Sequence, residues 1–497
     1  MRRSIRVLLA MTACLAAMLG VSASDAAAQS PAVVFMEPAP GAGVRTDSVY
    51  REVTDSAKVA EYRRWLDNES ARLALRLYAS AVAVARDERH LSSQPDAYYI
   101  ALVPGGNDAW VGFRLQSGAG TQTFPHAAYI LLAPEDGDFT TTLLHETGHM
   151  LLYILAGGQV VPRRKLIPIE HSTAALTDRG TAFDEGFAIH LETVMAQTGT
   201  EAWFVNQYRH GQMLFGVGPG MRNEYYRPSL DLLTFSQTVG RYVLVRDNHF
   251  GFEPAYGGPD YFRVQLDPSR DFAALRSADA LLQSEGFYAS FFFGLVMRGS
   301  GIPDSATIRL RERQTLVALA DLFGSEEVKP DTPYLLRFLA SFSRRFPADV
   351  PAIDDVFLDL THGVFVDPDA EAVWRAQYAA SIRADLAGLG RDSLNARRAR
   401  WRELLRANPQ VVYSRLGPQL RCEVVGVPVR MFGEASPLSF DANTVPAGVL
   451  RLVPGLTESG IAGWLRECAK HPFASGSDLA RRVSGVRGVG ARMRCGA

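Results

Sequence analysis

Two histidines and a glutamate near the end of the first third of the chain have the types and spacing of a metal-dependent hydrolytic site. His145, Glu146 and His149 form a His-Glu-x-x-His run within the otherwise apolar residues 143–152. Side chains four positions apart lie on one face of a helix, so both imidazoles can bind the same Zn²⁺ ion. Glu146 is then close enough to exchange a proton with a water molecule beside that ion.

The apolar surroundings of this run leave two interpretations open. A buried helix that carries imidazoles and a carboxylate is destabilised unless other groups pair with them, and a structural pair of core histidines would also meet that need. A catalytic zinc site additionally requires a third protein ligand and one open coordination position. The candidates for the third ligand are Glu185, His171 and His190.

Glu185 belongs to the stretch Asp184-Glu-Gly-Phe-Ala. Thr181 followed three residues later by Asp184 has the form of a capping box, which predicts a helix that runs to about Gly199 with Glu185 in its first turn. This second helix would have to lie beside the first for the three side chains to meet.

Together, the His-Glu-x-x-His run and the downstream Glu-Gly-Phe-Ala stretch resemble the gluzincin metallopeptidases, most closely their aminopeptidase branch. The resemblance implies that Glu185 is the third ligand and that Asp184 and Glu192 lie beside the ligands. It also implies an oxyanion-stabilising Tyr or His, for which Tyr288 is the candidate. The Gly-Ala-Met-Glu-Asn signature of the exopeptidases is missing and the segment after His149 is longer, so aminopeptidase specificity is not implied.

Three strand candidates precede the metal helix, at residues 97–103, 110–115 and 127–133. A small sheet followed by active-site helices is the zincin-like arrangement that the resemblance implies. In that arrangement we expect residues 127–133 to form the edge of the sheet, where an extended peptide substrate could bind through its main chain. A plain core strand is the alternative.

The rest of the chain is mostly helical in pattern. Residues 48–90 and 278–298 read as helices, as does most of 304–408 with Asp304 or Ser305 as its N-cap, whereas residues 29–47 read as a flexible arm. The predicted fold class is therefore α+β, with a mostly helical second part.

Four segments are expected from these patterns. They are a signal peptide at 1–28, a zincin-like metallopeptidase domain at 29–300, a helical domain at 301–420, and a strand plus helix-hairpin-helix module at 421–497.

The 497 residues are 47% hydrophobic and 21% charged, with a net charge of −1. This is ordinary globular composition, and it gives the chain no global attraction to nucleic acid or membrane.

The first 28 residues have the three parts of a secretory leader: arginines at the start, an apolar stretch at 7–21 and an Ala-Ala-Ala site before Gln29. No later segment is long and apolar enough to cross a bilayer. We therefore expect a periplasmic or extracellular protein with no stable membrane span.

Three cysteines remain after removal of the leader: Cys422, Cys468 and Cys495. An oxidising compartment favours one disulfide between two of them, and three pairings are possible.

The last 58 residues resemble the helix-hairpin-helix module of bacterial competence DNA receptors and of a type II secretion minor pseudopilin. The resemblance rests on Asn443-Thr444 opening a helix, Val453-Pro-Gly-Leu456 as a hairpin, Pro472-Phe473 as a link and residues 483–490 as a second hairpin. It implies that residues 440–497 bind DNA or a protein partner.

These patterns together predict a secreted zinc metallopeptidase that acts on peptide or protein substrates, with Glu146 as the general base. The alternative is a non-catalytic metal-fold scaffold whose tail binds DNA or a partner in secretion or the envelope.

Overall fold

A computed structural model describes most of the chain, in residues 30–43, 48–92, 94–137, 142–163, 176–202, 250–254, 262–266, 275–299, 301–325, 328–373, 375–376, 399–405, 416–431, 434–445, 447–489 and 492–496. The predicted leader and His171 lie outside these residues.

The amino-terminal part is a closed five-stranded barrel with the strand order β1-β2-β4-β5-β3. Its strands are β1 (Val33–Pro38), β2 (Ser48–Glu52), β3 (Tyr98–Leu102), β4 (Asn107–Ser117) and β5 (Gly120–Leu132). Residues alternate along each strand between the two faces of the barrel wall. Tyr99 and Phe113 are among the aromatic residues that fill the interior, whereas Tyr98 and Ile100 pack against the helices outside.

Two of the expected boundaries were wrong. The arm predicted at residues 29–47 contains strand β1, and the helical pattern predicted from residue 48 begins with strand β2. Both strands are short. They pair with each other in antiparallel fashion, and each has a second, parallel partner far along the chain, β3 for β1 and β4 for β2. Local composition therefore carries little of the information that makes them strands.

The expectation that residues 127–133 form a sheet edge was also wrong. Residues 130–132 of β5 pair with β3 on one side and with β4 on the other. Further back along β5, the Gln94 side chain donates to the His126 carbonyl (2.5 Å) and accepts from the Ala128 amide (3.5 Å). This part of β5 is therefore already occupied by the protein's own groups.

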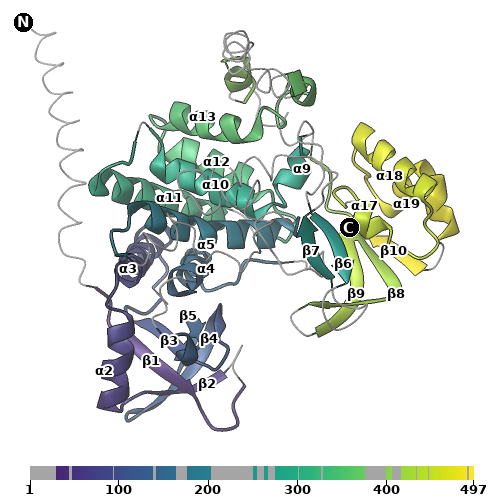
Figure 1. The fold of residues 1–497 in the computed structure, drawn as a ribbon. Coiled ribbons are helices and arrows are strands. Elements are labelled where there is room, and N and C mark those ends of the chain that lie inside the picture. The colour runs from purple at the N-terminus through teal and green to yellow at the C-terminus, as the bar shows by residue number, and fades with distance from the viewer. Residues whose placement is uncertain are drawn as a thin grey trace, which may run out of the picture.

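Most of the helices lie in successive layers on one side of the barrel, whereas α2 lies alongside the barrel and α9 lies near β7 (Figure 1). These helices are α2 (Ser56–Trp65), α3 (Glu69–Arg89), α4 (Thr142–Leu155), α5 (Arg179–Thr198), α9 (Ala278–Leu281), α10 (Glu285–Met297), α11 (Ser305–Ser325), α12 (Tyr334–Arg345) and α13 (Val350–Thr361). Helix α4 contacts β4 and β5 below it and α5 above it, and α5 in turn packs against α10. Asp304 caps α11 as expected, because its carboxylate accepts from the amides of Ala306 and Thr307.

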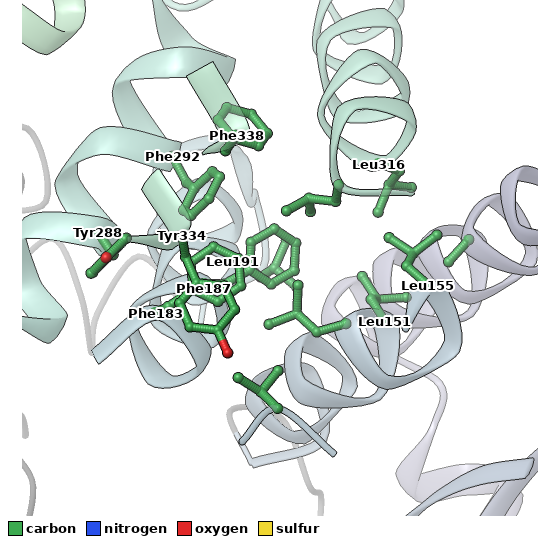
Figure 2. Packing of buried hydrophobic residues seen from close by; sticks show 14 of the residues in the cluster. Leu151, Leu155, Phe183, Phe187, Leu191, Tyr288, Phe292, Leu316, Tyr334 and Phe338 are labelled. Carbon is green, nitrogen blue, oxygen red and sulfur yellow. The ribbon is translucent and has the colours of Figure 1, made fainter. Parts of the chain in front are cut away.

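One hydrophobic core joins the predicted domains 29–300 and 301–420. Figure 2 shows Phe183 and Phe187 of α5 facing Phe292 of α10, with Tyr334 and Phe338 of α12 beside them. The rings of Phe183 and Tyr334 stack with centroids 4.6 Å apart. Each fully buried aromatic ring contributes about 2–3 kcal/mol to stability, so the carboxy-terminal helices hold α5 in place.

The carboxy-terminal module has a core of its own around Trp464, Phe440 and Phe473. It consists of β8 (Arg421–Met431), β9 (Glu434–Asp441), α17 (Ala447–Leu450), α18 (Glu458–Lys470), α19 (Gly476–Arg482) and β10 (Met493–Gly496), with the sheet order β10-β8-β9. A disulfide joins Cys422 to Cys495 and leaves Cys468 as a free thiol. The separate hairpin of β6 (Phe250–Pro254) and β7 (Phe262–Leu266) lies nearby in Figure 1.

Buried polar contacts connect this module to the helical core. Gln283 donates to Asp441 (2.9 Å) and accepts from Thr444 (2.8 Å). Arg179, the first residue of α5, pairs with Asp279 (2.6 Å) and donates to the Gly417 carbonyl (3.0 Å). Among the helices that the structure describes, none has the length and apolar character needed to span a membrane.

Candidate metal centre

Helix α4 presents both histidines of the sequence motif toward α5. Twelve of its residues, Glu146 and His149 among them, are buried. The Thr147 hydroxyl donates to the Leu143 carbonyl (2.6 Å) and bonds to the Tyr98 hydroxyl of β3 (2.5 Å). The barrel therefore fixes the rotation of α4 at the motif itself.

Helix α5 begins earlier than the capping box predicts. Its N-cap is Asp178, whose carboxylate accepts from the amides of Gly180 (3.0 Å) and Thr181 (3.1 Å). Asp178 satisfies two amides that the first turn leaves without helical partners, so the helix starts at Arg179 and Glu185 lies in its second turn. The expected end near Gly199 is confirmed.

Two glycines allow the helices to approach closely around the site. A Cβ added to Gly148 would lie 2.5 Å from the Ala188 Cα atom on α5. A Cβ added to Gly186 would lie 2.4 Å from the Glu285 carbonyl oxygen and from the Tyr288 Cβ atom on α10. Helix α5 is therefore held between α4 and α10 at backbone contact, which brings Glu185 within reach of α4.

Three side-chain atoms converge between α4 and α5. The Nε2 atoms of His145 and His149 lie 3.3 Å apart, and the Glu185 Oε2 atom lies 3.3 Å from each of them. A tetrahedral zinc ion with bonds of about 2.0–2.1 Å holds its ligand atoms about 3.3–3.4 Å apart. The spacing of the three atoms therefore fits the ion that the sequence motif implies, and the same residues form a potential metal-binding group by geometry.

The other nitrogen of each imidazole is bound to a carboxylate. His145 Nδ1 lies 2.5 Å from Glu192 Oε1, and His149 Nδ1 lies 2.6 Å from Asp184 Oδ1. A carboxylate accepts the Nδ1 proton and leaves the Nε2 lone pair directed at the metal position, an arrangement common behind zinc-bound histidines.

The side chains around the three converging atoms differ in exposure. The side chains of His145 and Glu192 are each 22% exposed, whereas those of His149 and Glu185 are 5% and 4% exposed. Of the two imidazoles, that of His145 is the more accessible in the part of the chain that the structure describes.

The electrostatics of this cluster favour a cation. Burial lowers the pKa of His149, but Asp184 and Glu185 outweigh it and raise the pKa to about 10. In the same way, hydrogen bonds to Glu185 and Glu192 overcome the effect of burial and raise the pKa of His145 well above its ordinary value. Positive charge, carried by protons or by a metal, is therefore stabilised between these carboxylates.

Glu146 is 3% exposed and is close enough to His145, His149 and Glu185 to interact with them electrostatically. Burial raises its pKa to about 7, and the nearby Glu185 and Asp108 of β4 add to the effect while both histidines oppose it. A carboxyl group with a pKa near neutrality can both accept a proton and return it, which suits a general base.

Sequence reasoning missed two residues of the site. Arg163, in the segment after α4, lies 2.7 Å from Asp184 Oδ2 and 3.2 Å from Glu185 Oε1. The Tyr153 hydroxyl donates to Asp184 Oδ2 (3.1 Å). Tyr153 is one helical turn beyond His149 on the same face, a spacing that could have indicated it; nothing in the local sequence separates Arg163 from the two basic residues that follow it.

The candidate ligand His190 and the candidate oxyanion-stabilising residue Tyr288 both lie in the hydrophobic core. His190 packs its ring between Phe187 (centroids 4.6 Å apart) and Phe292 (5.4 Å), and burial lowers its pKa to about 3. Tyr288 is fully buried against the Phe183 ring, so the structure places it in the core and not among the metal-facing side chains. The remaining rival ligand, His171, lies outside the described residues.

The two hairpins of the carboxy-terminal module pack together where two glycines meet. A Cβ added to Gly485 would lie 2.8 Å from the Gly460 Cα atom. In the first hairpin, Gly455 adopts a φ of +87°, and the Thr457 hydroxyl accepts from the Gly460 amide (3.2 Å). The Thr457 side chain therefore caps the start of α18, at the helix terminus where the resemblance places a phosphate.

Comparison of the chain with protein-family models, with curated proteins and with solved structures finds no match.

Proposed function

We propose that this protein is a zinc-dependent metallopeptidase of the gluzincin type that hydrolyses peptide bonds in peptide or protein substrates. The observation that carries the proposal is the 3.3 Å spacing among His145 Nε2, His149 Nε2 and Glu185 Oε2. Three protein atoms from two helices provide the ligand number of a catalytic zinc site, which leaves the fourth tetrahedral position for water or substrate.

In this proposal His145, His149 and Glu185 hold the ion, and Asp184 and Glu192 orient the imidazoles. Zinc in such a site supplies Lewis acidity, which polarises a carbonyl group and makes water a stronger acid. Glu146 accepts the proton of the attacking water and returns it to the nitrogen of the departing amine. Its raised pKa and its position beside the ligands support this assignment.

We further propose that the protein works outside the cytoplasm, in the periplasm or the extracellular medium. Support comes from the leader-like residues 1–28 and from the Cys422–Cys495 disulfide, because disulfides persist in oxidising compartments.

Metal analysis combined with a peptide-library digest of the processed protein tests the proposal. We expect one zinc ion per chain, and hydrolysis that a chelator abolishes and added zinc restores. Absence of bound zinc and of hydrolysis would overturn it. Retention on double-stranded DNA that weakens between 50 and 200 mM salt, without any hydrolysis, would instead support the scaffold whose tail binds DNA.

A further inference from the structure

Arg163 lies behind the proposed ligands and contacts two adjacent carboxylates of α5. Its Nη2 atom is 2.7 Å from Asp184 Oδ2, and its Nη1 atom is 3.2 Å from Glu185 Oε1. The Arg163 side chain is 30% exposed, whereas those of Asp184 and Glu185 are nearly inaccessible at 0% and 4%. The planar guanidinium therefore bridges two buried acids that differ in function.

The two oxygens of Glu185 have different environments because of this contact. Oε2 faces the Nε2 atoms of both histidines at 3.3 Å, and Oε1 faces the guanidinium. A carboxylate can bind a metal through one oxygen or through both. With Oε1 held by Arg163, only Oε2 is directed at the metal position, so Glu185 offers a single ligand atom.

The contact with Asp184 has a different consequence. Asp184 Oδ1 accepts from His149 Nδ1, and Oδ2 accepts from both Arg163 and the Tyr153 hydroxyl. Tyr153 and His149 would still hold Asp184 if Arg163 were removed. Glu185 Oε1 would lose the guanidinium that now lies 3.2 Å from it, on the side away from the two imidazoles.

We propose that Arg163 is a positioning residue that restricts Glu185 to ligation through one oxygen and thereby keeps the fourth coordination position open. The inference rests on the proposed function, because it assumes that the three ligands bind a metal. It adds a role for a residue that comes from the connection between the two helices and not from either helix.

Cobalt substitution of the full-length protein tests this role without relying on activity. The visible bands of Co²⁺ are stronger in four-coordinate than in five-coordinate sites, so they report a change in the ligation of Glu185. We expect Arg163→Gln to weaken these bands, as both Glu185 oxygens become ligands.

Arg163→Lys provides a second variant that keeps the positive charge and is better tolerated beside two buried acids. A lysine cannot bridge both carboxylates in a plane, so we expect its cobalt bands to weaken as well. Arg76→Gln is the matched control: Arg76 pairs with the buried Glu312 (2.7 Å) away from the site, and its loss should leave the cobalt spectrum unchanged.

The outcomes separate the two proposals. If the wild-type protein binds neither zinc nor cobalt, the proposed function fails and the role of Arg163 fails with it. If the wild type binds cobalt, and folded Arg163→Gln or Arg163→Lys shows the wild-type spectrum, only the role of Arg163 is overturned.

Discussion

Gly148 of α4 lies against Ala188 of α5 so closely that a Cβ on the glycine would be 2.5 Å from the Ala188 Cα atom. The glycine is inside the His-Glu-x-x-His run, between the two histidines that face α5. The distance between the helices, and with it the distance from the imidazoles to Glu185, therefore depends on the absence of a side chain at this position.

Replacement of Gly148 by alanine should push α4 and α5 apart. We expect the free energy of unfolding to fall by about 1–3 kcal/mol through overpacking, and zinc affinity to fall with it. Chelator competition and denaturant unfolding measure the two effects. Gly463→Ala on α18 is the matched control, since its nearest neighbour is the end of the Arg466 side chain at 3.9 Å, and it should be neutral or slightly stabilising.

Replacement of Glu146 by glutamine should separate binding from turnover. The amide cannot accept a proton, so we expect hydrolysis to fall by about 10²- to 10⁴-fold while zinc stoichiometry stays the same. Metal analysis and kcat/KM on one peptide substrate provide the comparison, with the exposed Glu61→Gln as control. Full activity in the Glu146 variant would show that another group carries the proton.

The two carboxylates behind the histidines should contribute unequally to zinc affinity. Asp184 is fully buried, and its charge interacts with both His149 and Arg163. We expect Asp184→Asn to lower zinc affinity by about 100-fold, the larger of the effects typical for such residues. Glu192→Gln changes a side chain that is 22% exposed, where water can replace the hydrogen bond to His145, so the loss should be smaller. Equal losses in a chelator titration would contradict this ranking.

Stability should decline in mild acid because of His190. Burial lowers its pKa to about 3 from an ordinary 6.5, so between these values the unfolded chain binds a proton that the folded chain does not. Stability is then complete above pH 6.5 and falls by about 1.4 kcal/mol per pH unit below it. His190→Leu should lack this part of the slope when wild type and variant are unfolded in denaturant at pH 7.5 and 5.5. Identical slopes would show that His190 is protonated in the folded protein.

The Cys422–Cys495 disulfide should stabilise the carboxy-terminal module in particular. It closes a loop with a sequence separation of 73, and the chain-entropy model assigns such a cross-link about 4 kcal/mol. Because the module has its own hydrophobic core, we expect reduction to unfold it at lower denaturant concentration while zinc content is retained. Cys468→Ser is the control; simultaneous loss of zinc would show that the module and the metal helices unfold together.

The sequence alone could predict the parts of the site that depend on local spacing. The positions of His145 and His149 on one helix face follow from a separation of four residues, whereas Glu185 was singled out by the family resemblance of its Glu-Gly-Phe-Ala stretch. The role of Arg163 could not be predicted, because its contacts depend on the path of the connection between α4 and α5. Tyr288 looked suitable by residue type, but the packing of α10 on Gly186 directs it into the core.

In the fold, too, the elements with a clear local sequence pattern could be predicted, and those that depend on distant partners could not. Strands β3, β4 and β5 were recognisable from apolar and aromatic runs, although β5 begins seven residues before its predicted start. Strands β1 and β2 were not, since each is short and completes its pairing with a parallel strand 65 positions away along the chain, as Val33 with Tyr98 and Ser48 with Phe113. Barrel closure, which removes the expected sheet edge, is a property of all five strands together.

The contact between Arg179 and the Gly417 carbonyl spans 238 positions of the chain. During synthesis, His145 and His149 therefore emerge well before the residue that completes the anchorage of the first turn of α5. Before Gly417 is made, the first turn of α5 has the Asp178 cap and the Arg179–Asp279 pair but lacks this hydrogen bond. The last contact of this turn can therefore form only after most of the polypeptide has been made.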